Sequence, residues 1–159
     1  MTTVLFLGLG HMGGPMAANL AAAGHRVLGF DLVPEALEKA RAAGIETVTD
    51  TAAAAAEADV VLTMLPNGRL VLDVYRGREG APGLLDAARP GTVFLDCSTI
   101  EVAQAREAAQ AADEKHKKFD DEKSEFMGYL KLWKWIEEGR GTHGHSATGD
   151  SHKLSNRQQ

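Results

Sequence analysis

A glycine motif of the form G-x-G-x-x-G lies near the start of the chain, and its members are Gly8, Gly10 and Gly13. The apolar run 4–9 that contains its first glycine is typical of a buried parallel strand. The alanine-rich segment 13–24 has a proline in its first turn and a glycine at its end, as a helix would. Residues 26–31 form a second apolar run. Strand, glycine turn, helix and strand in this order predict a βαβ unit, which restricts the chain to a parallel α/β sheet.

Helix and strand patterns continue to alternate as far as residue 99. Helices are predicted over 34–44, 51–58, 68–76 and 83–88, and strands over 45–48, 59–66 and 92–99. Asp50 or Thr51 can cap the predicted helix 51–58. Helical segments between successive strands predict an α/β fold with a Rossmann-type, doubly wound parallel sheet over residues 1–112.

The composition changes abruptly near residue 112. Alanine is abundant before this point and only Ala147 follows it, while lysine replaces arginine as the main basic residue. Residues 113–138 carry apolar side chains at helical spacing, which are Phe119, Phe126, Leu130, Trp133 and Ile136. This pattern predicts an amphipathic helix of separate origin, and residues 113–136 are a candidate homodimer interface. Residues 139–159 have little to bury and are expected to form a flexible polar tail.

Each position of the glycine motif has a physical use. Gly8 permits a tight turn, Gly10 lets a pyrophosphate approach the backbone, and Gly13 lets helix and strand pack closely. The start of the following helix offers free N–H groups and a positive dipole end to phosphates. Asp31 ends the next strand, where a carboxylate accepts hydrogen bonds from ribose hydroxyls and repels a 2′-phosphate. The motif therefore predicts NAD rather than NADP, and the alternative is a glycine-rich turn in an α/β domain that binds no nucleotide.

A family resemblance supports the nucleotide interpretation. Residues 6–31 read FLGLGHMGGPMAANLAAAGHRVLGFD. They resemble the N-terminal signature of the β-hydroxyacid dehydrogenases, and most of all that of the 3-hydroxyisobutyrate dehydrogenases. Two later stretches, MLPN at 64–67 and DCSTI at 96–100, strengthen the resemblance. It covers about residues 2–112.

The resemblance implies a set of cofactor contacts at the carboxyl edge of the sheet. The glycine loop is expected to bind through Gly8, Leu9, Gly10, His11, Met12 and Gly13. His11 is interpreted as a backbone N–H donor rather than as an acid or base. Leu65 and Pro66 are implied to flank the adenosine end of the cofactor. Ser98 and Thr99 are implied to lie near the nicotinamide and the substrate.

The resemblance ends at about residue 112. Complete members of the family continue with a D-x-P-V-S-G-G loop for the substrate carboxylate and with a catalytic lysine in a Gly-x-Gly-x-x-x-Lys context. Neither pattern occurs after residue 112. Lys115, Lys117 and Lys118 are interpreted as the solvated face of a charged helix. No catalytic residue is therefore assigned, and turnover by this chain would require a partner chain that completes the site.

Charge, hydropathy and cysteine content predict which kinds of partner and which cellular location fit this chain. A net charge of -5 and a hydrophobic content of 44% predict a globular protein whose partners are neither nucleic acids nor membranes. No stretch approaches the roughly 20 apolar residues of a membrane helix, and no signal-peptide pattern precedes the first strand. The single cysteine, Cys97, is interpreted as a packed thiol, and a cytoplasmic location is expected. Solvated histidines are favoured over a metal site at His116, His143, His145 and His152.

Two hypotheses of different classes follow. The first is the NAD-binding domain of a 3-hydroxyisobutyrate dehydrogenase-like oxidoreductase, which in complete relatives transfers hydride between a small 3-hydroxy acid and NAD. The second is a non-catalytic dinucleotide-binding or interaction module, produced by truncation, fusion or engineering. Binding of NADH tests what the two share, and turnover with a hydroxy acid separates them.

Overall fold

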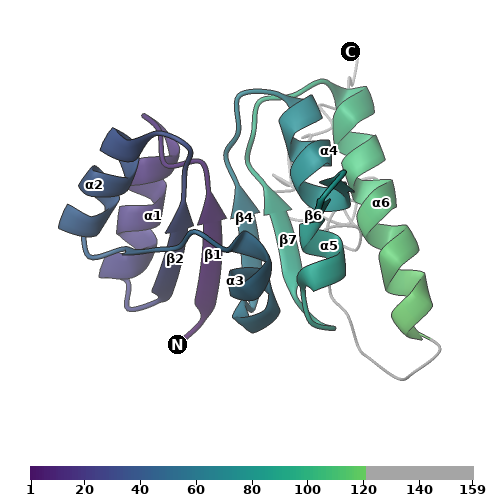
Figure 1. Ribbon diagram of the computed structural model, residues 1–159, viewed down its shortest axis with the longest axis horizontal. Helices are drawn as coiled ribbons and strands as arrows, with labels where there is room; N and C mark the ends of the chain where they lie inside the picture. The colour runs from purple at the N-terminus through teal and green to yellow at the C-terminus, as the bar shows by residue number, and fades with distance from the viewer. Residues whose placement is uncertain (121–159) are drawn as a thin grey trace, which may run out of the picture.

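The computed structural model describes residues 1–120, with side chains for residues 1–115 (Figure 1). Its centre is a five-stranded sheet in the order β3-β2-β1-β4-β7, in which all neighbours are parallel. The strands are β1 (Thr3–Leu7), β2 (Arg26–Phe30), β3 (Glu46–Thr47), β4 (Val60–Thr63) and β7 (Val93–Asp96). The predicted Rossmann-type sheet is thereby confirmed.

Helices cover both faces of this sheet. They are α1 (Gly13–Ala22), α2 (Pro34–Ala42), α3 (Thr51–Glu57), α4 (Gly68–Arg76), α5 (Leu84–Ala87) and α6 (Val102–Asp120). Residues of α1 and α2 pack on one face, and residues of α3, α4, α5 and α6 pack on the other (Figure 1). The result is the three-layer arrangement that parallel strands require, because a parallel sheet is buried on both faces.

The central strand β1 shows how the core is divided. Leu5 and Leu7 pack in the cluster that includes α3, α4, α5 and α6, whereas Val4 and Phe6 pack in the cluster of α1 and α2. Leu5 and Phe6 are both 0% exposed. Successive side chains point to opposite faces of a strand, so an unbroken apolar run fills both cores.

Several helix ends follow the predicted signals. Asp50 Oδ1 accepts a hydrogen bond from the Ala53 N–H at 2.9 Å, so Asp50 caps α3 as expected. Gly24 and Gly44, just past α1 and α2, have φ angles of +87° and +80°. These left-handed angles favour glycine and explain why each helix stops there.

The two strands that lead to the candidate site, β4 and β7, stop short of their predicted ends. β4 stops at Thr63, because the Leu65 N–H is donated to Ser98 Oγ at 2.8 Å rather than to a neighbouring strand. β7 stops at Asp96, because the Ser98 N–H bends back to the Asp96 carboxylate at 3.1 Å. Side-chain acceptors thus compete with the strand ladder at both positions.

Two further features were not predicted. A small antiparallel hairpin of β5 (Gly77–Arg78) and β6 (Ala81–Pro82) connects α4 to α5. Helix α6 runs without interruption through residue 112, so the change in composition falls inside one helix. Most of the predicted helix 113–138 and the whole tail 139–159 lie outside the described residues. Their separate origin stays a prediction.

No helix between residues 1 and 120 is both long enough and apolar enough to cross a membrane.

Candidate cofactor-binding site

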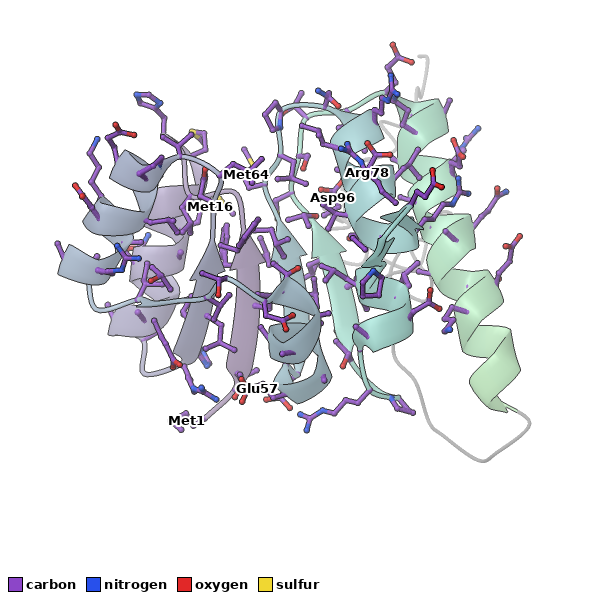
Figure 2. The ribbon with its side chains drawn as sticks, viewed as in Figure 1. Met1, Met16, Glu57, Met64, Arg78 and Asp96 are labelled. Carbon is purple, nitrogen blue, oxygen red and sulfur yellow. The ribbon has the colours of Figure 1, made fainter. Side chains whose placement is uncertain are left out.

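The topology of the sheet creates a crevice between β1 and β4. From β1 the chain adds β2 and β3 on one side, and it later adds β4 and β7 on the other side. The connections that leave the carboxyl ends of β1 and β4 therefore diverge, and ligands of open α/β sheets bind at such a point. Figure 2 shows Met64 and Asp96 at this carboxyl edge, with Met1 and Glu57 at the opposite edge.

The three motif glycines differ in what surrounds them. A Cβ at Gly8 would lie 2.2 Å from the carbonyl oxygen of Met64, and Gly8 has a φ of +92°. A Cβ at Gly13 would lie 1.8 Å from the Gly8 oxygen, which is the close packing of helix on strand that the motif predicts. A Cβ at Gly10, in contrast, would meet no protein atom within 4 Å. The fold thus requires glycine at two positions, and at Gly10 the backbone faces open space.

The start of α1 differs from the starts of α3 and α4. Side chains of Asp50 and Asn67 cap α3 and α4 by accepting backbone N–H groups at 2.9 and 3.0 Å. No side chain caps α1 at Met12, and its first turn contains no acidic residue. The Gly14 N–H donates to the Gly10 oxygen at 2.9 Å and Pro15 has no N–H, so α1 offers an anion its positive dipole end and the remaining N–H groups of its first turn.

Asp31 ties the glycine loop to the end of β2. Its Oδ2 accepts a hydrogen bond from the Leu9 N–H at 2.6 Å, and its Oδ1 accepts one from the Val33 N–H at 2.8 Å. Gly8 adds a backbone bond from its N–H to the Phe30 oxygen at 3.0 Å. The sequence predicts Asp31 as a ligand for ribose, which stays a prediction, and it did not reveal this second role in holding the loop. The glycine loop therefore fixes the carboxylate of Asp31 beside the place where the cofactor is predicted to bind.

A cleft of about 560 Å³ lies beside the glycine loop. The loop contributes Gly10 and His11, and small side chains of α1 and α2 form much of the remaining wall. Three charged side chains also line it, namely Asp31, Glu35 and Lys39. Lys39 is eight residues from Asp31 in the sequence, yet it lines the same cleft. It shares this cleft with the carboxylates of Asp31 and Glu35.

The loops after β4 and β7 are joined by hydrogen bonds. Ser98 Oγ accepts from the Leu65 N–H at 2.8 Å and donates to Asp96 Oδ1 at 2.6 Å. The buried Thr63 hydroxyl donates to the same Asp96 oxygen at 2.9 Å. Both Thr63 and Asp96 were missed as site residues in the sequence. A signal was present for Asp96, because an Asp commonly accepts the backbone N–H two residues further on in a turn, whereas the sequence had no such signal for Thr63.

The predicted site residues therefore gather at one edge of the molecule. Gly8 to Gly13 follow β1, Asp31 follows β2, Leu65 and Pro66 follow β4, and Ser98 and Thr99 follow β7. Gly10, His11 and Met12 of the glycine loop are exposed, Met12 to 62%. Their contacts with a cofactor stay a prediction, whereas their common location is a property of the fold.

The interpretation of Cys97 as a packed thiol is wrong. Cys97 is exposed, because it follows the end of β7 rather than lying within the strand. Partial burial of its thiol, and then the charge of Asp96, raise its pKa. The thiol is therefore protonated at neutral pH, which makes it a poor nucleophile.

Within the described part of the chain, no three His, Cys, Asp or Glu side chains are grouped as a metal site would need. Three of the four histidines considered above, His143, His145 and His152, lie outside the described residues, as does the side chain of His116.

Comparisons with known proteins agree with this geometry. Residues 3–121 match the family described as the NAD binding domain of 6-phosphogluconate dehydrogenase. A probable 3-hydroxyisobutyrate dehydrogenase of Mycobacterium bovis is 50% identical over 113 residues, which are 71% of this chain and 36% of that protein. An NAD-dependent L-serine dehydrogenase of Pseudomonas aeruginosa is 43% identical over 115 residues, 72% of this chain and 38% of that protein. The solved structure of Mycobacterium tuberculosis 3-hydroxyisobutyrate dehydrogenase with L-serine has a TM-score of 0.67 and 49% identity, covering 73% of this chain and 38% of that chain.

Strand order and glycine loop together define a dinucleotide-binding Rossmann domain. The chain belongs to the family of NAD-binding domains found in 6-phosphogluconate dehydrogenase. It is the NAD-binding domain of a 3-hydroxyisobutyrate dehydrogenase-like protein, and it spans 36% of the length of the M. bovis relative. The predicted family and cofactor are thereby confirmed.

Proposed function

We propose that the carboxyl edge of the sheet binds NAD(H), with the diphosphate at the start of α1 and the adenosine ribose on Asp31. The observation that carries this proposal is the open space at Gly10 beside a helix start that no side chain caps. A phosphate can approach the backbone there because no Cβ intervenes, and the helix dipole favours its negative charge.

Asp31 has the capacity that this role needs. An ionised carboxylate offers about four acceptor positions, and the N–H groups of Leu9 and Val33 use two of them. The others are available to the two ribose hydroxyls. Two carboxylates, Asp31 and Glu35, line this cleft with one cation, Lys39. The excess negative charge disfavours an added 2′-phosphate, so we expect NAD to bind better than NADP.

The loops after β4 and β7 are assigned to opposite ends of the cofactor. Leu65 and Pro66 would flank the adenosine end, and Ser98 and Thr99 would lie near the nicotinamide ring. The hydrogen bond between the Leu65 N–H and Ser98 Oγ supports this assignment, because it brings the two loops together at the crevice.

The reaction of the whole protein is inferred to be oxidation of a small 3-hydroxy acid. NAD supplies the hydride acceptor when bound, while protein groups must hold the substrate and take the hydroxyl proton. This chain contributes the cofactor site, and it contains no lysine in the context expected of the family's catalytic residue. A non-catalytic binding module is the second candidate, favoured because residues 113–159 contain no stretch that resembles the substrate loop or the catalytic lysine context. A cytoplasmic location and a homodimer through residues 113–136 belong to the same proposal.

Calorimetric titration with NADH and NADPH tests the cofactor assignment. We expect saturable binding of NADH and at least about tenfold weaker binding of NADPH, which corresponds to roughly 1.4 kcal/mol. Circular dichroism on the same sample establishes that it is folded. A folded sample without affinity for either nucleotide would overturn the proposal.

A further inference from the structure

A second carboxylate at the carboxyl edge is that of Asp96. It accepts hydrogen bonds from a residue at the end of β4 and from a residue in the loop after β7. Asp96 and Thr63 are register partners at the ends of these two strands. Asp96 Oδ1 accepts three hydrogen bonds, from Thr63 Oγ1 at 2.9 Å, from Ser98 Oγ at 2.6 Å and from the Ser98 N–H at 3.1 Å. Figure 2 shows Asp96 at the same edge as Met64, which begins the neighbouring loop.

Ser98 connects this carboxylate to the loop after β4 by two hydrogen bonds. Its only hydroxyl hydrogen is donated to Asp96, and one of its lone pairs accepts the Leu65 N–H at 2.8 Å. The short Ser98 bond has the geometry of a charge-assisted hydrogen bond to a carboxylate. Ser98 therefore cannot donate to a ligand while this arrangement is intact, and its main work is to hold Leu65.

We propose that Asp96 is a positioning residue for the nicotinamide nucleotide, because through Ser98 it fixes loop 64–67 relative to loop 96–100. This inference rests on the proposed function, which places the adenosine end at the first loop and the nicotinamide at the second. The two loops leave different strands, and their spacing decides whether one dinucleotide can contact both. The role of Asp96 in this proposal is exerted through its bonds to Thr63 and Ser98.

The proposal predicts that loss of the Asp96 carboxylate changes the affinities for NADH and for ADP-ribose by different factors. ADP-ribose lacks the nicotinamide ring and so needs only the glycine loop, Asp31 and loop 64–67. NADH needs both loops at their correct spacing. Loss of the Asp96 carboxylate should therefore weaken NADH more than ADP-ribose, whereas general destabilisation of the fold would weaken both alike.

The test compares dissociation constants for NADH and ADP-ribose in the full chain. For Asp96→Ala we expect the NADH constant to rise about tenfold and the ADP-ribose constant to change less than about twofold. Asp96→Asn keeps an oxygen acceptor at this place and should restore most of the NADH affinity. Ser98→Ala, which removes the link to Leu65, should reproduce the selective loss.

Asp59→Ala is the matched control. Asp59 also accepts a backbone N–H, that of Thr3 at 2.8 Å, but it lies at the opposite edge of the sheet, where β4 begins. This variant should have a lower melting temperature and unchanged constants for both ligands.

Three outcomes would overturn the proposal. Equal weakening of both ligands in Asp96→Ala would show a structural role only, and an unchanged NADH constant would show no role. If Asp96→Ala does not fold, Thr63→Val, which removes the hydroxyl bond to Asp96 Oδ1 and leaves Ser98 in place, decides by the same ratio of the NADH and ADP-ribose constants. A wild-type chain that binds neither ligand overturns the proposed function and this inference together. If the wild type binds NADH but the ratio of the NADH and ADP-ribose constants is the same in Asp96→Ala, the inference alone is overturned.

Discussion

Two aspartates at the carboxyl edge end their strands by the same local turn. The carboxylates of Asp31 and Asp96 each accept the N–H two residues further on, from Val33 at 2.8 Å and from Ser98 at 3.1 Å. Each also bonds a group on the neighbouring strand or loop, Leu9 in one case and Thr63 in the other. The side chains that shape the loops of the site are thus the ones that terminate the strands.

Asp31→Asn should reduce the preference for NAD over NADP. The substitution keeps one oxygen acceptor but removes the charge that repels a 2′-phosphate and strengthens the bonds to ribose. We expect the NADH constant to rise by about tenfold and the NADPH constant to fall or stay constant. Titration of the variant with both nucleotides measures the change.

Asp50→Asn is the control for Asp31→Asn, because asparagine is as good an N-cap as aspartate and α3 does not belong to the cofactor site. Its ratio of constants should equal that of the wild type. An Asp31→Asn chain with an unchanged ratio would contradict the role assigned to this carboxylate.

Gly10 and Gly13 should respond to substitution in opposite ways. Gly10→Val adds a side chain into open space, so the fold should persist while the diphosphate is blocked and NADH binding is lost. Gly13→Ala places a Cβ 1.8 Å from the Gly8 oxygen, which should destabilise the fold by about 1–3 kcal/mol or more. Urea unfolding and NADH titration of both variants separate the two effects.

The control for Gly10→Val is Ala22→Val, which adds a similar side chain at the exposed far end of α1. It should retain NADH binding. Binding by Gly10→Val at wild-type affinity would place the diphosphate elsewhere.

At the scale of the element, sequence patterns predicted where helices and strands occur better than where they end. The apolar runs of β1 and β2 and the proline and glycine limits of α2 are local signals. The end of β4 depends instead on Ser98, which meets Leu65 across the two strands only after folding, whereas the turn of Asp96 and Ser98 that ends β7 is local. The absence of a cap on α1 can be read from the sequence, because Met12 has no side-chain oxygen.

The amino end of β1 is held by Asp59, and this contact should make stability depend on pH. The N–H of Thr3 donates to Asp59 Oδ2 at 2.8 Å, and Arg89 pairs with the other oxygen. The hydrogen bond from Thr3, and then the charge of Arg89, lower the pKa of Asp59 below its ordinary value. A carboxyl with a lowered pKa in the folded state stabilises the fold at pH values above its unfolded pKa of about 3.9.

Asp59→Asn should therefore melt at a lower temperature than the wild type at pH 7. The difference should shrink as the pH falls below about 4, through the lowered pKa of the folded state, because protonation removes the same charge from the wild type. Thermal melts between pH 2 and 7 measure it. Arg89→Gln should keep most of the pH dependence, since the Thr3 hydrogen bond is the larger cause. A melting difference that is constant over this range would exclude the Asp59 charge as its source.

At the scale of the whole molecule, the fold class was predictable because its signals are repeated along the chain. Five strand patterns separated by helical patterns leave few alternatives to a doubly wound sheet, and the glycine loop falls at the switch between β1 and β4. The continuity of α6 was not predictable from composition, since alanine-rich and charged segments are both good helix formers. Its buried Ala108 and Ala111 pack with α4 and α5, so the helix completes the domain before the composition changes.

The domain should bind the cofactor without turning over a substrate. With saturating NAD and either 3-hydroxyisobutyrate or L-serine, we expect no NADH formation above the buffer rate at 340 nm. The physical reason is that hydride transfer needs a proton acceptor within hydrogen-bond reach of the substrate hydroxyl and groups that hold the substrate carboxylate. The chain carries neither the loop nor the lysine context that the family resemblance implies for these tasks.

The same sample must bind NADH, so that inactivity is not mistaken for unfolding. Measurable turnover would contradict the prediction, and a triple variant of Lys115→Gln, Lys117→Gln and Lys118→Gln would then locate its source. Loss of activity in that variant would assign the proton acceptor to these lysines, against their interpretation as a solvated face. Activity that survives would require another acceptor in the chain or in a second copy of it. In either case the cofactor site at the β1–β4 crevice would have a catalytic group beside it, and the domain would be an enzyme.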